Sequence, residues 1–376
     1  MVYILLPFIF IIFTLFEQIT KKKKDILLLV IFITLIEIFF YGTRYKLGVD
    51  WQNYIDFFSS QDESFHFEVG YRWLNLLFSS IGLDYWGVSF LASLMLISST
   101  SMLAWRFIPY PVLFLTVNFF TSLFYNIEAV RSMIGYSIII FSFRYLFERK
   151  VIYFLIATFL AALFHQTMLV FSLFAFVYRV NLKRSTFFIL TIIGLLFYFT
   201  NISPVLSLLY FISSFMFEHR LAYYLKEINE MHYDAVITMS FYAKIFVFSI
   251  IVFMKNKIEE NCDNQLVFRV FYNIGIAYIL IFVYMGMVPT LVYRTSDLFV
   301  LGYIAAICFC IEKFNYIFRI FFVVLLLSLH LYLYSSPFES DFYKKYILDY
   351  TSFLYLIFSD VKENYNVSDF WGGVHE

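Results

Sequence analysis

The sequence is poor in charged residues, which make up only 14% of its 376 positions. An ordinary soluble domain carries about 25%, so this composition excludes that class. The 27 basic and 27 acidic residues cancel, and without surplus positive charge the chain has no bulk attraction for nucleic acid. Hydrophobic residues reach 62% and recur in runs of about 18 to 23, the length that crosses about 30 Å of hydrocarbon. We therefore expect a polytopic integral membrane protein.

Cysteine and the motifs of common catalytic sites are equally scarce. The three cysteines, Cys262, Cys308 and Cys310, offer neither a disulfide framework nor metal-ligand spacing, and we interpret them as small buried hydrophobic residues. The sequence has no Gly-rich phosphate loop followed by lysine and no Gly-x-Ser-x-Gly elbow. We expect no cofactor, no metal site and metal-independent chemistry.

The N-terminus lacks the basic stretch and small-residue cleavage site of a secretory signal, which predicts a retained first span. Two short apolar stretches lie between residues 151 and 179 and are interrupted at residues 164–166. Counting this pair, we expect about 12 spans in an all-α bundle. A stretch of about 13 residues is short for a span, so this pair is expected to be re-entrant or tilted. The other predicted spans are 2–18, 25–42, 86–106, 110–127, 130–147, 186–211, 236–254, 266–288, 294–311 and 314–336.

Amphipathic segments complete the predicted architecture. Residues 68–82 favour a helix lying in the membrane interface, and the aromatic stretch 346–358 favours another. Nothing in the sequence marks a soluble domain or a linker, so we expect one membrane domain over residues 1–376. Lysine and arginine favour the cytoplasmic side of short loops, so the basic residues 21–24 place the first loop inside and the N-terminus outside. The orientation of the chain after residues 68–82 follows by alternation if this segment does not span. The long loops near 43–67 and 212–235 and the tail 337–376 then face outward.

Arginines recur on this predicted outer side. A guanidinium is permanently charged and binds phosphate through two parallel hydrogen bonds, so several around one outer cavity would suit a diphosphate head group. The alternative is interfacial snorkelling or local ion pairing, such as Arg131 with Glu128 or Arg294 with Asp297. The candidates are Arg44, Arg131, Arg220 and Arg294.

Three residues are candidates for acid–base chemistry. His165 lies at the interruption of the short pair, where a broken helix exposes backbone and polar pockets form, although a buried structural histidine fits as well. Asp50 follows Gly48, which permits a tight turn, and Tyr54 lies one helical turn further on. His219 stands in the second long loop and could equally be solvated surface.

Two ionisable residues lie inside predicted spans. Glu37 and Lys244 could form a structural pair or mark a proton pathway, because charged groups within a membrane face the bundle interior and have partners.

These segments together resemble the EpsG/Wzy-type polysaccharide polymerase family of bacterial envelopes. The resemblance rests on the order of Arg44, Gly48-Val49-Asp50 and Tyr54, on Ile127-to-Arg131 opening a span, and on Ala161-to-Thr167. It extends through Arg294 and covers about residues 1–335. The family often has glutamine after the arginine that opens the helix, whereas this chain has Ser132. The expected fold also resembles that of GT-C-type glycosyltransferases.

The resemblance implies a polymerase at the outer face of the bacterial cytoplasmic membrane. It would join oligosaccharide repeat units carried on undecaprenyl pyrophosphate into capsular, O-antigen or exopolysaccharide chains, with the four arginines holding the diphosphate. His165 would be the first choice as general base, followed by Asp50 and His219, and Tyr54 and Tyr224 would contact sugars. Membrane lipids, a chain-length regulator and a flippase are the further partners implied.

Two alternatives remain open from the sequence. One is a ligase or transferase that uses the same lipid carrier. The other is a flippase or transporter of lipid-linked saccharides, in which Glu37 and Lys244 would couple transport to ion movement. A transporter predicts cations through the middle of the membrane and an inverted repeat, whereas the candidate arginines gather on one side and the halves show no repeat. The sequence therefore favours chemistry at a fixed face.

Overall fold

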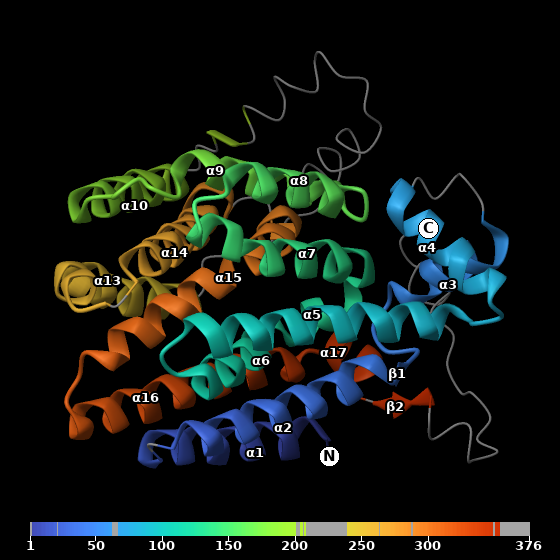
Figure 1. The fold of residues 1–376 in the computed structure, drawn as a ribbon, viewed down its shortest axis with the longest axis horizontal. Coiled ribbons are helices and arrows are strands. Elements are labelled where there is room, and N and C mark those ends of the chain that lie inside the picture. Colours follow the sequence, from blue (N-terminus) through green and yellow to red (C-terminus); the bar gives the residue numbers. More distant parts are fainter. Residues whose placement is uncertain are drawn as a thin grey trace. The chain divides into compact units, whose positions relative to one another are not determined.

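The computed structural model of the chain is built almost entirely of helices (Figure 1). It describes residues 2–20, 22–61, 67–200, 204–205, 207, 239–262, 264–286, 289–348 and 350–353. Contacts between elements divide the chain into two compact units. Unit 1 contains residues 1–176 and 324–376, and unit 2 contains residues 177–323.

Unit 1 is a bundle in which α5 packs against α2, α6 and α7, and α7 packs against α8. Phe10, Phe119 and Phe143 are among the fully buried side chains at its centre. Its helices are α1 (Val2–Ile19), α2 (Lys23–Gly42), α3 (Trp51–Ser60), α4 (Val69–Ser80), α5 (Tyr85–Phe107), α6 (Pro111–Glu128), α7 (Val130–Phe147), α8 (Val151–Ala162) and α17 (Asp341–Tyr346).

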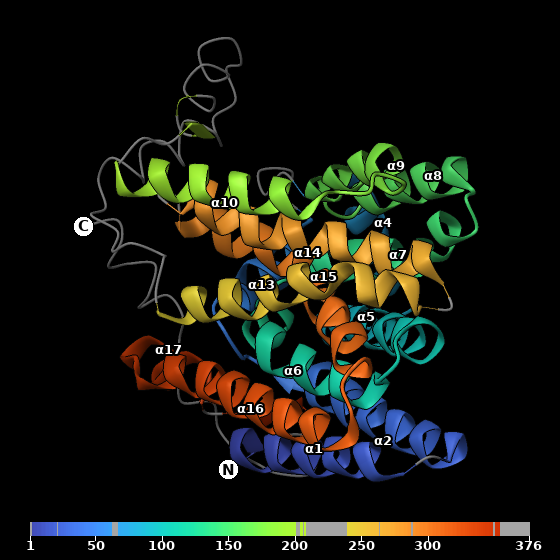
Figure 2. The same ribbon diagram turned by 90° about the vertical axis from the view of Figure 1, so that its left-hand side faces the viewer.

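Unit 2 contains four helices that run side by side in Figure 2. They are α10 (Arg184–Phe199), α13 (Met239–Glu260), α14 (Gln265–Met285) and α15 (Pro289–Glu312). The short α9 (Phe174–Val177) and the long α16 (Tyr316–Ser335) each begin in one unit and end in the other.

Local sequence signals explain several helix starts. Pro111 stands at the first position of α6, where its missing N–H would have no partner in any case. The side chain of Asp84 caps α5 by accepting the Gly87 amide at 3.2 Å. Asn264 caps α14 in the same way, accepting the Val267 amide at 3.3 Å.

The predicted all-α, multi-pass membrane fold is confirmed. Seven helical segments of the described chain are long and apolar enough to cross a membrane: Val2–Ile19, Lys23–Gly42, Tyr85–Phe107, Val130–Phe147, Gln265–Met285, Thr295–Glu312 and Tyr316–Glu339. The other predicted spans, 110–127, 186–211 and 236–254, fall on α6, α10 and α13, although residues 201–203, 206, 208–211 and 236–238 lie outside the described chain. The single-domain organisation stays a prediction.

The predicted break in the short pair is also present. Helix α8 ends at Ala162, the chain turns through Leu163–His165, and a 3₁₀ segment, Gln166–Leu173, leads into α9. Within residues 68–82, Val69–Ser80 form the 12-residue α4. A helix of that length is only about 18 Å long, so it cannot cross about 30 Å of hydrocarbon.

The tail returns to the end of α2 as a strand. Strand β2 (Thr351–Ser352) pairs antiparallel with β1 (Arg44–Tyr45), with Arg44 opposite Ser352. The Tyr350 hydroxyl also donates to the Phe40 carbonyl at 2.9 Å. The sequence predicts a helix over 346–358. At residues 351–352 the backbone instead completes a sheet, because the edge of β1 offers hydrogen-bond partners there.

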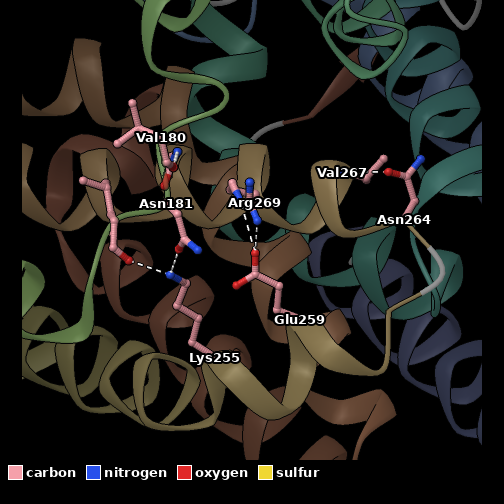
Figure 3. Close-up of polar contacts among 9 residues, drawn as sticks. Val180, Asn181, Lys255, Glu259, Asn264, Val267 and Arg269 are labelled. Atoms are coloured by element: carbon pink, nitrogen blue, oxygen red, sulfur yellow. Dashed lines mark hydrogen bonds and ion pairs between the residues drawn. The ribbon is translucent and has the colours of Figure 1, made fainter.

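A separate polar network ties the helix ends of unit 2 together (Figure 3). The Lys255 ammonium donates to Asn181 Oδ1 and to the Leu182 carbonyl, and Arg269 pairs with Glu259. These contacts join the loop before α10 to the end of α13, and the end of α13 to the start of α14.

Candidate functional site

The candidate site lies at the end of unit 1 where α2 and α6 finish and α5 and α7 begin. Figure 1 shows α3, α4, β1 and β2 gathered at this end. Several of its polar groups come from loops and first turns, where backbone groups are not used within a helix. The elements that meet here are far apart in sequence, so the packing of the bundle creates the site.

Arg44 is enclosed, with only 3% of its surface exposed. Its Nε donates to the Ile127 carbonyl at 3.2 Å, and one terminal nitrogen donates to Ser93 Oγ at 2.9 Å and to the Tyr41 carbonyl. Burial lowers the pKa of its guanidinium. Arg44 therefore joins the ends of α2 and α6 to the side of α5.

The turn after Arg44 is held by Glu128, the last residue of α6. The carboxylate of Glu128 accepts the Val49 amide at 3.0 Å and the Asp50 amide at 2.9 Å. Gly48 adopts φ +84° and donates its own amide to the Tyr346 carbonyl at 2.9 Å. The predicted tight turn at Gly48 is thus present, and it presents Asp50 at the start of α3.

Arg131 forms an ion pair with Glu68 rather than with its sequence neighbour Glu128. A terminal nitrogen of Arg131 lies 2.5 Å from Glu68 Oε2, and both side chains are largely buried, with exposed fractions of 18% and 11%. The guanidinium carbon lies 4.3 Å from the centre of the Phe67 ring and 5.9 Å from that of Tyr54. These aromatic faces add a cation–π attraction.

His165 binds the other oxygen of the same carboxylate. Its Nδ1 lies 3.2 Å from Glu68 Oε1, and the Gln166 amide donates to that oxygen at 3.3 Å. The His165 side chain is 23% exposed, so it is accessible from outside the protein. One carboxylate therefore bridges the predicted phosphate-binding arginine and the first-choice base.

The charge state of Glu68 fixes the tautomer of His165. Burial opposes ionisation of Glu68, but the hydrogen bond from His165 and the charge of Arg131 outweigh it and lower its pKa from 4.5 to about 2. An ionised carboxylate only accepts hydrogen bonds, so the proton of a neutral His165 is on Nδ1. Its Nε2 then carries a lone pair that can accept a proton.

Tyr54 packs in a cluster of buried phenol rings. Its ring centre lies 5.8 Å from that of Tyr71 and 6.0 Å from that of Tyr85, and only 5% of its surface is exposed. Burial raises the pKa of the Tyr54 phenol, which therefore stays protonated. The ring of Tyr54 forms one wall against Arg131.

Five of the predicted residues thus lie at one end of unit 1: Arg44, Asp50, Tyr54, Arg131 and His165. Three others, His219, Arg220 and Tyr224, lie outside the described residues. Arg294 lies in α15 of unit 2, but its side chain is not among those that the structure describes. The roles of these nine residues stay predictions.

Sequence reasoning missed Glu68 as a member of the site. Glu68 stands just before α4, and Arg72 lies four residues further on, a spacing that suggests a local pair. The structure shows that its carboxylate instead joins residues 63 and 97 positions away. The sequence signal for Glu68 was a single acidic residue at the start of an amphipathic helix.

The two intramembrane charges have separate surroundings in the two units. In unit 2 the Lys244 ammonium lies 5.5 Å and 5.2 Å from the ring centres of Tyr278 and Phe282 and interacts with the charge of Asp297. In unit 1 Glu37 is 1% exposed, and its Oε1 has no hydrogen-bond partner among the described residues. Within the described ranges, no three His, Cys, Asp or Glu side chains gather in a group that could hold a metal ion.

Comparison with known proteins identifies the family. No curated protein and no solved structure is found to match the chain. The EpsG family model matches residues 26–352, a range that includes every described residue of the site above. The chain therefore belongs to the EpsG family, and this membership indicates a membrane-embedded polysaccharide polymerase of exopolysaccharide biosynthesis.

Proposed function

We propose that the chain polymerises lipid-linked oligosaccharide units by metal-independent glycosyl transfer at the outer face of the bacterial cytoplasmic membrane. The glycan of a donor would pass from an isoprenyl diphosphate, such as undecaprenyl pyrophosphate, to a hydroxyl of the next lipid-linked unit. The observation that carries this proposal is the carboxylate of Glu68, which holds Arg131 and His165 together. One side chain can thereby position both a cation and a base.

His165 is the proposed general base. Its Nδ1–H is held by Glu68, so Nε2 takes the proton of the attacking hydroxyl as the new glycosidic bond forms. Glu68 also stabilises the imidazolium that results, because its carboxylate is already ionised. Asp50 and His219 remain the alternative bases.

Arg131 is the proposed cation for the leaving group. When the bond between the anomeric carbon and the phosphate oxygen breaks, the diphosphate takes the electron pair and its negative charge increases. A preorganised guanidinium in a partly dry site stabilises this charge more effectively than water does. Glu68 accepts from one terminal nitrogen of Arg131, and the side chain is 18% exposed, so the guanidinium would offer its other N–H groups to substrate oxygens.

An apolar groove supports a lipid-linked substrate. It is an open groove of about 420 Å³ along α1 and α2, and its lining includes Thr43, the residue directly before Arg44. An isoprenoid chain lying in this groove would bring its diphosphate to the end of α2. The lining includes Leu6, Phe32, Leu35, Phe39, Thr43 and Tyr350.

The remaining predicted residues have supporting roles in this proposal. Arg44 fixes the end of α2 against α5 and α6 through its hydrogen bonds to Ser93 and Ile127. Arg220 and Arg294 would supply further positive charge to the diphosphates, and Tyr54 and Tyr224 would contact sugar rings. A flippase and a chain-length regulator are proposed partners, because the substrate must reach the outer leaflet and the product must stop growing.

The test is to replace Arg131 or His165 by alanine in the producing strain. We expect each variant to lose long polymer by about 100-fold or more, since a base or a charge-stabilising donor contributes about that factor. Single lipid-linked units should accumulate on the outer leaflet. The measurement is gel analysis of polysaccharide together with leaflet-specific labelling of lipid-linked units.

Lys344→Ala is the control, because this lysine is half exposed and lies 3.3 Å from the exposed carboxylate of Asp341, three residues earlier in the same helix. It should leave the polymer unchanged. Loss of outer-leaflet units in the Arg131 variant would show a flippase instead. Polymer of normal length in His165→Ala, at normal protein level, would exclude His165 as the base.

A further inference from the structure

We propose that Glu128 is a positioning residue of this site: its carboxyl group caps α3 from another helix and thereby holds Tyr54 beside Arg131. This inference rests on the proposed function for its effect on polymerisation, but its structural part stands alone. Arg131 pairs with Glu68, so Glu128 has no role in the ion pair that its spacing suggests.

The first observation is the pair of amides that Glu128 accepts. Asp50 is the N-cap residue of α3, and its own side chain makes no capping hydrogen bond. The amides of Val49 and Asp50 donate to Glu128 instead, at 3.0 Å and 2.9 Å. Burial and the nearby Asp50 raise the pKa of Glu128 to about 8, whereas the two amide hydrogen bonds act in the opposite direction. Glu128 therefore fixes where α3 begins.

The second observation is that the carboxyl group of Glu128 occupies the space where a side chain at position 48 would lie. A Cβ added at Gly48 would collide with the carboxylate group of Glu128. The φ of +84° at Gly48 is in a region that other residues rarely adopt. Gly48 thus serves both the turn and the close approach of Glu128.

The third observation connects this contact to the site. Helix α3 carries Tyr54, whose ring faces the Arg131 guanidinium at 5.9 Å. Arg131 is three residues after Glu128, and Ala129 between them has the non-helical angles φ −95° and ψ 54°. The junction of α6 and α7 therefore directs Glu128 toward the 48–50 turn and Arg131 toward Glu68. A shift of Glu128 would separate α3 from the cation it covers.

The experiment uses the full-length protein in nanodiscs and two readouts. Hydrogen–deuterium exchange of residues 46–54 reports the capping contact. The rate of polymer formation from the strain's own lipid-linked units gives kcat and KM. We expect Glu128→Ala to speed exchange in this segment and to lower kcat about 10-fold to 100-fold, since small misplacements in an active site have effects of that size. Glu128→Gln should largely restore both, because its amide oxygen still accepts backbone N–H groups.

Gly48→Ala provides an independent variant that keeps the carboxylate but displaces it. It should reproduce the faster exchange and the lower kcat of Glu128→Ala. Gly82→Ala is the matched control, because Gly82 has a similar φ of +76° but nothing within 4 Å of the added Cβ. The control should leave exchange in residues 46–54 and polymerisation unchanged.

The outcomes separate the inference from the proposed function. Unchanged exchange in Glu128→Ala would overturn the capping role. Faster exchange with unchanged kcat in Glu128→Ala would overturn the link between the capping contact and polymerisation. The same would follow if Glu128→Gln exchanged as slowly as the unsubstituted protein but were as inactive as Glu128→Ala. If the unsubstituted protein forms no polymer from lipid-linked units, the proposed function fails, whereas the exchange result still decides the capping role.

Discussion

The ion pair of Arg131 differs from the one that helical spacing predicts, because a single residue interrupts the helix. Residues three apart on a continuous helix are neighbours, and this spacing suggests that Arg131 pairs with Glu128. Ala129 interrupts the helix between them, so the two side chains leave the junction in different directions. Arg44, Asp50, Tyr54, Arg131 and His165 could be named from sequence because of their residue types at span ends. Glu68 could not, because its partners are set by the packing of α4 against α8.

The low pKa of Glu68 gives a prediction about stability and pH. A carboxylate whose pKa falls from 4.5 to about 2 on folding stabilises the folded protein above pH 4.5. That contribution decreases as the pH falls toward about 2. The unfolding temperature of the unsubstituted protein should therefore exceed that of Glu68→Gln by a constant margin above about pH 5. The margin should shrink below about pH 4.5.

Thermal unfolding of both proteins in detergent, from pH 7 to pH 3.5, measures this margin. Glu148→Gln is the control, because Glu148 is half exposed and pairs with Lys150 at the surface, where ion pairs contribute little. A margin that grows on acidification would contradict the assigned charge state of Glu68.

At the scale of elements, the long helices are the predictable part. Their apolar runs match the hydrocarbon thickness, so predicted spans such as 25–42 and 130–147 coincide with α2 and α7 within a few residues. The short elements α3, β1 and β2 have no such length signal. Strand β2 exists because β1 offers an edge, and α3 starts where Glu128 accepts its amides. Contacts between segments that are distant in sequence therefore determine where both elements form.

The packing of α4 against the break after α8 gives a prediction at this scale. The Gly70 amide donates to the Leu163 carbonyl at 2.8 Å, and a Cβ at Gly70 would lie 2.8 Å from that same oxygen. Gly70→Ala should therefore push α4 away from His165 and destabilise the protein by about 1–3 kcal/mol. It should also reduce polymer formation, because Glu68 stands two residues earlier.

Thermal unfolding and gel analysis of polysaccharide give the two measurements for Gly70→Ala. Gly87→Ala is the control, because an added Cβ there meets the ring of Phe78 at 3.1 Å, and a side chain moves aside more easily than a backbone carbonyl. Equal effects of the two substitutions would show that the contact with Leu163 has no special importance.

For the whole molecule, composition predicts the membrane class but not the division into two units. Spans in both units are equally apolar, so nothing in the sequence marks the boundary near residues 176 and 323. Helix α4 is too short to span, and the predicted orientation depends on that fact. This orientation stays a prediction, and it would place the described site residues on the outer side, together with the ends of α2 and α6.

Cysteine labelling of intact cells tests this orientation. With Cys262 replaced by serine, Ser80→Cys should react with a membrane-impermeant maleimide added outside, because Ser80 is exposed at the end of α4. Lys24→Cys, also exposed, should react only after the cells are opened. Labelling in the opposite order would invert the topology and place the site in the cytoplasm.

The pairing of β2 with β1 has a consequence for how the protein is made. The Phe40 carbonyl and the Tyr350 hydroxyl that binds it are 310 residues apart. Ribosomes add about 5–20 residues per second, so the first strand emerges tens of seconds before its partner. A nascent chain therefore cannot form this pairing until residues 351–352 have left the ribosome, so the end of α2 acquires its sheet partner late in synthesis.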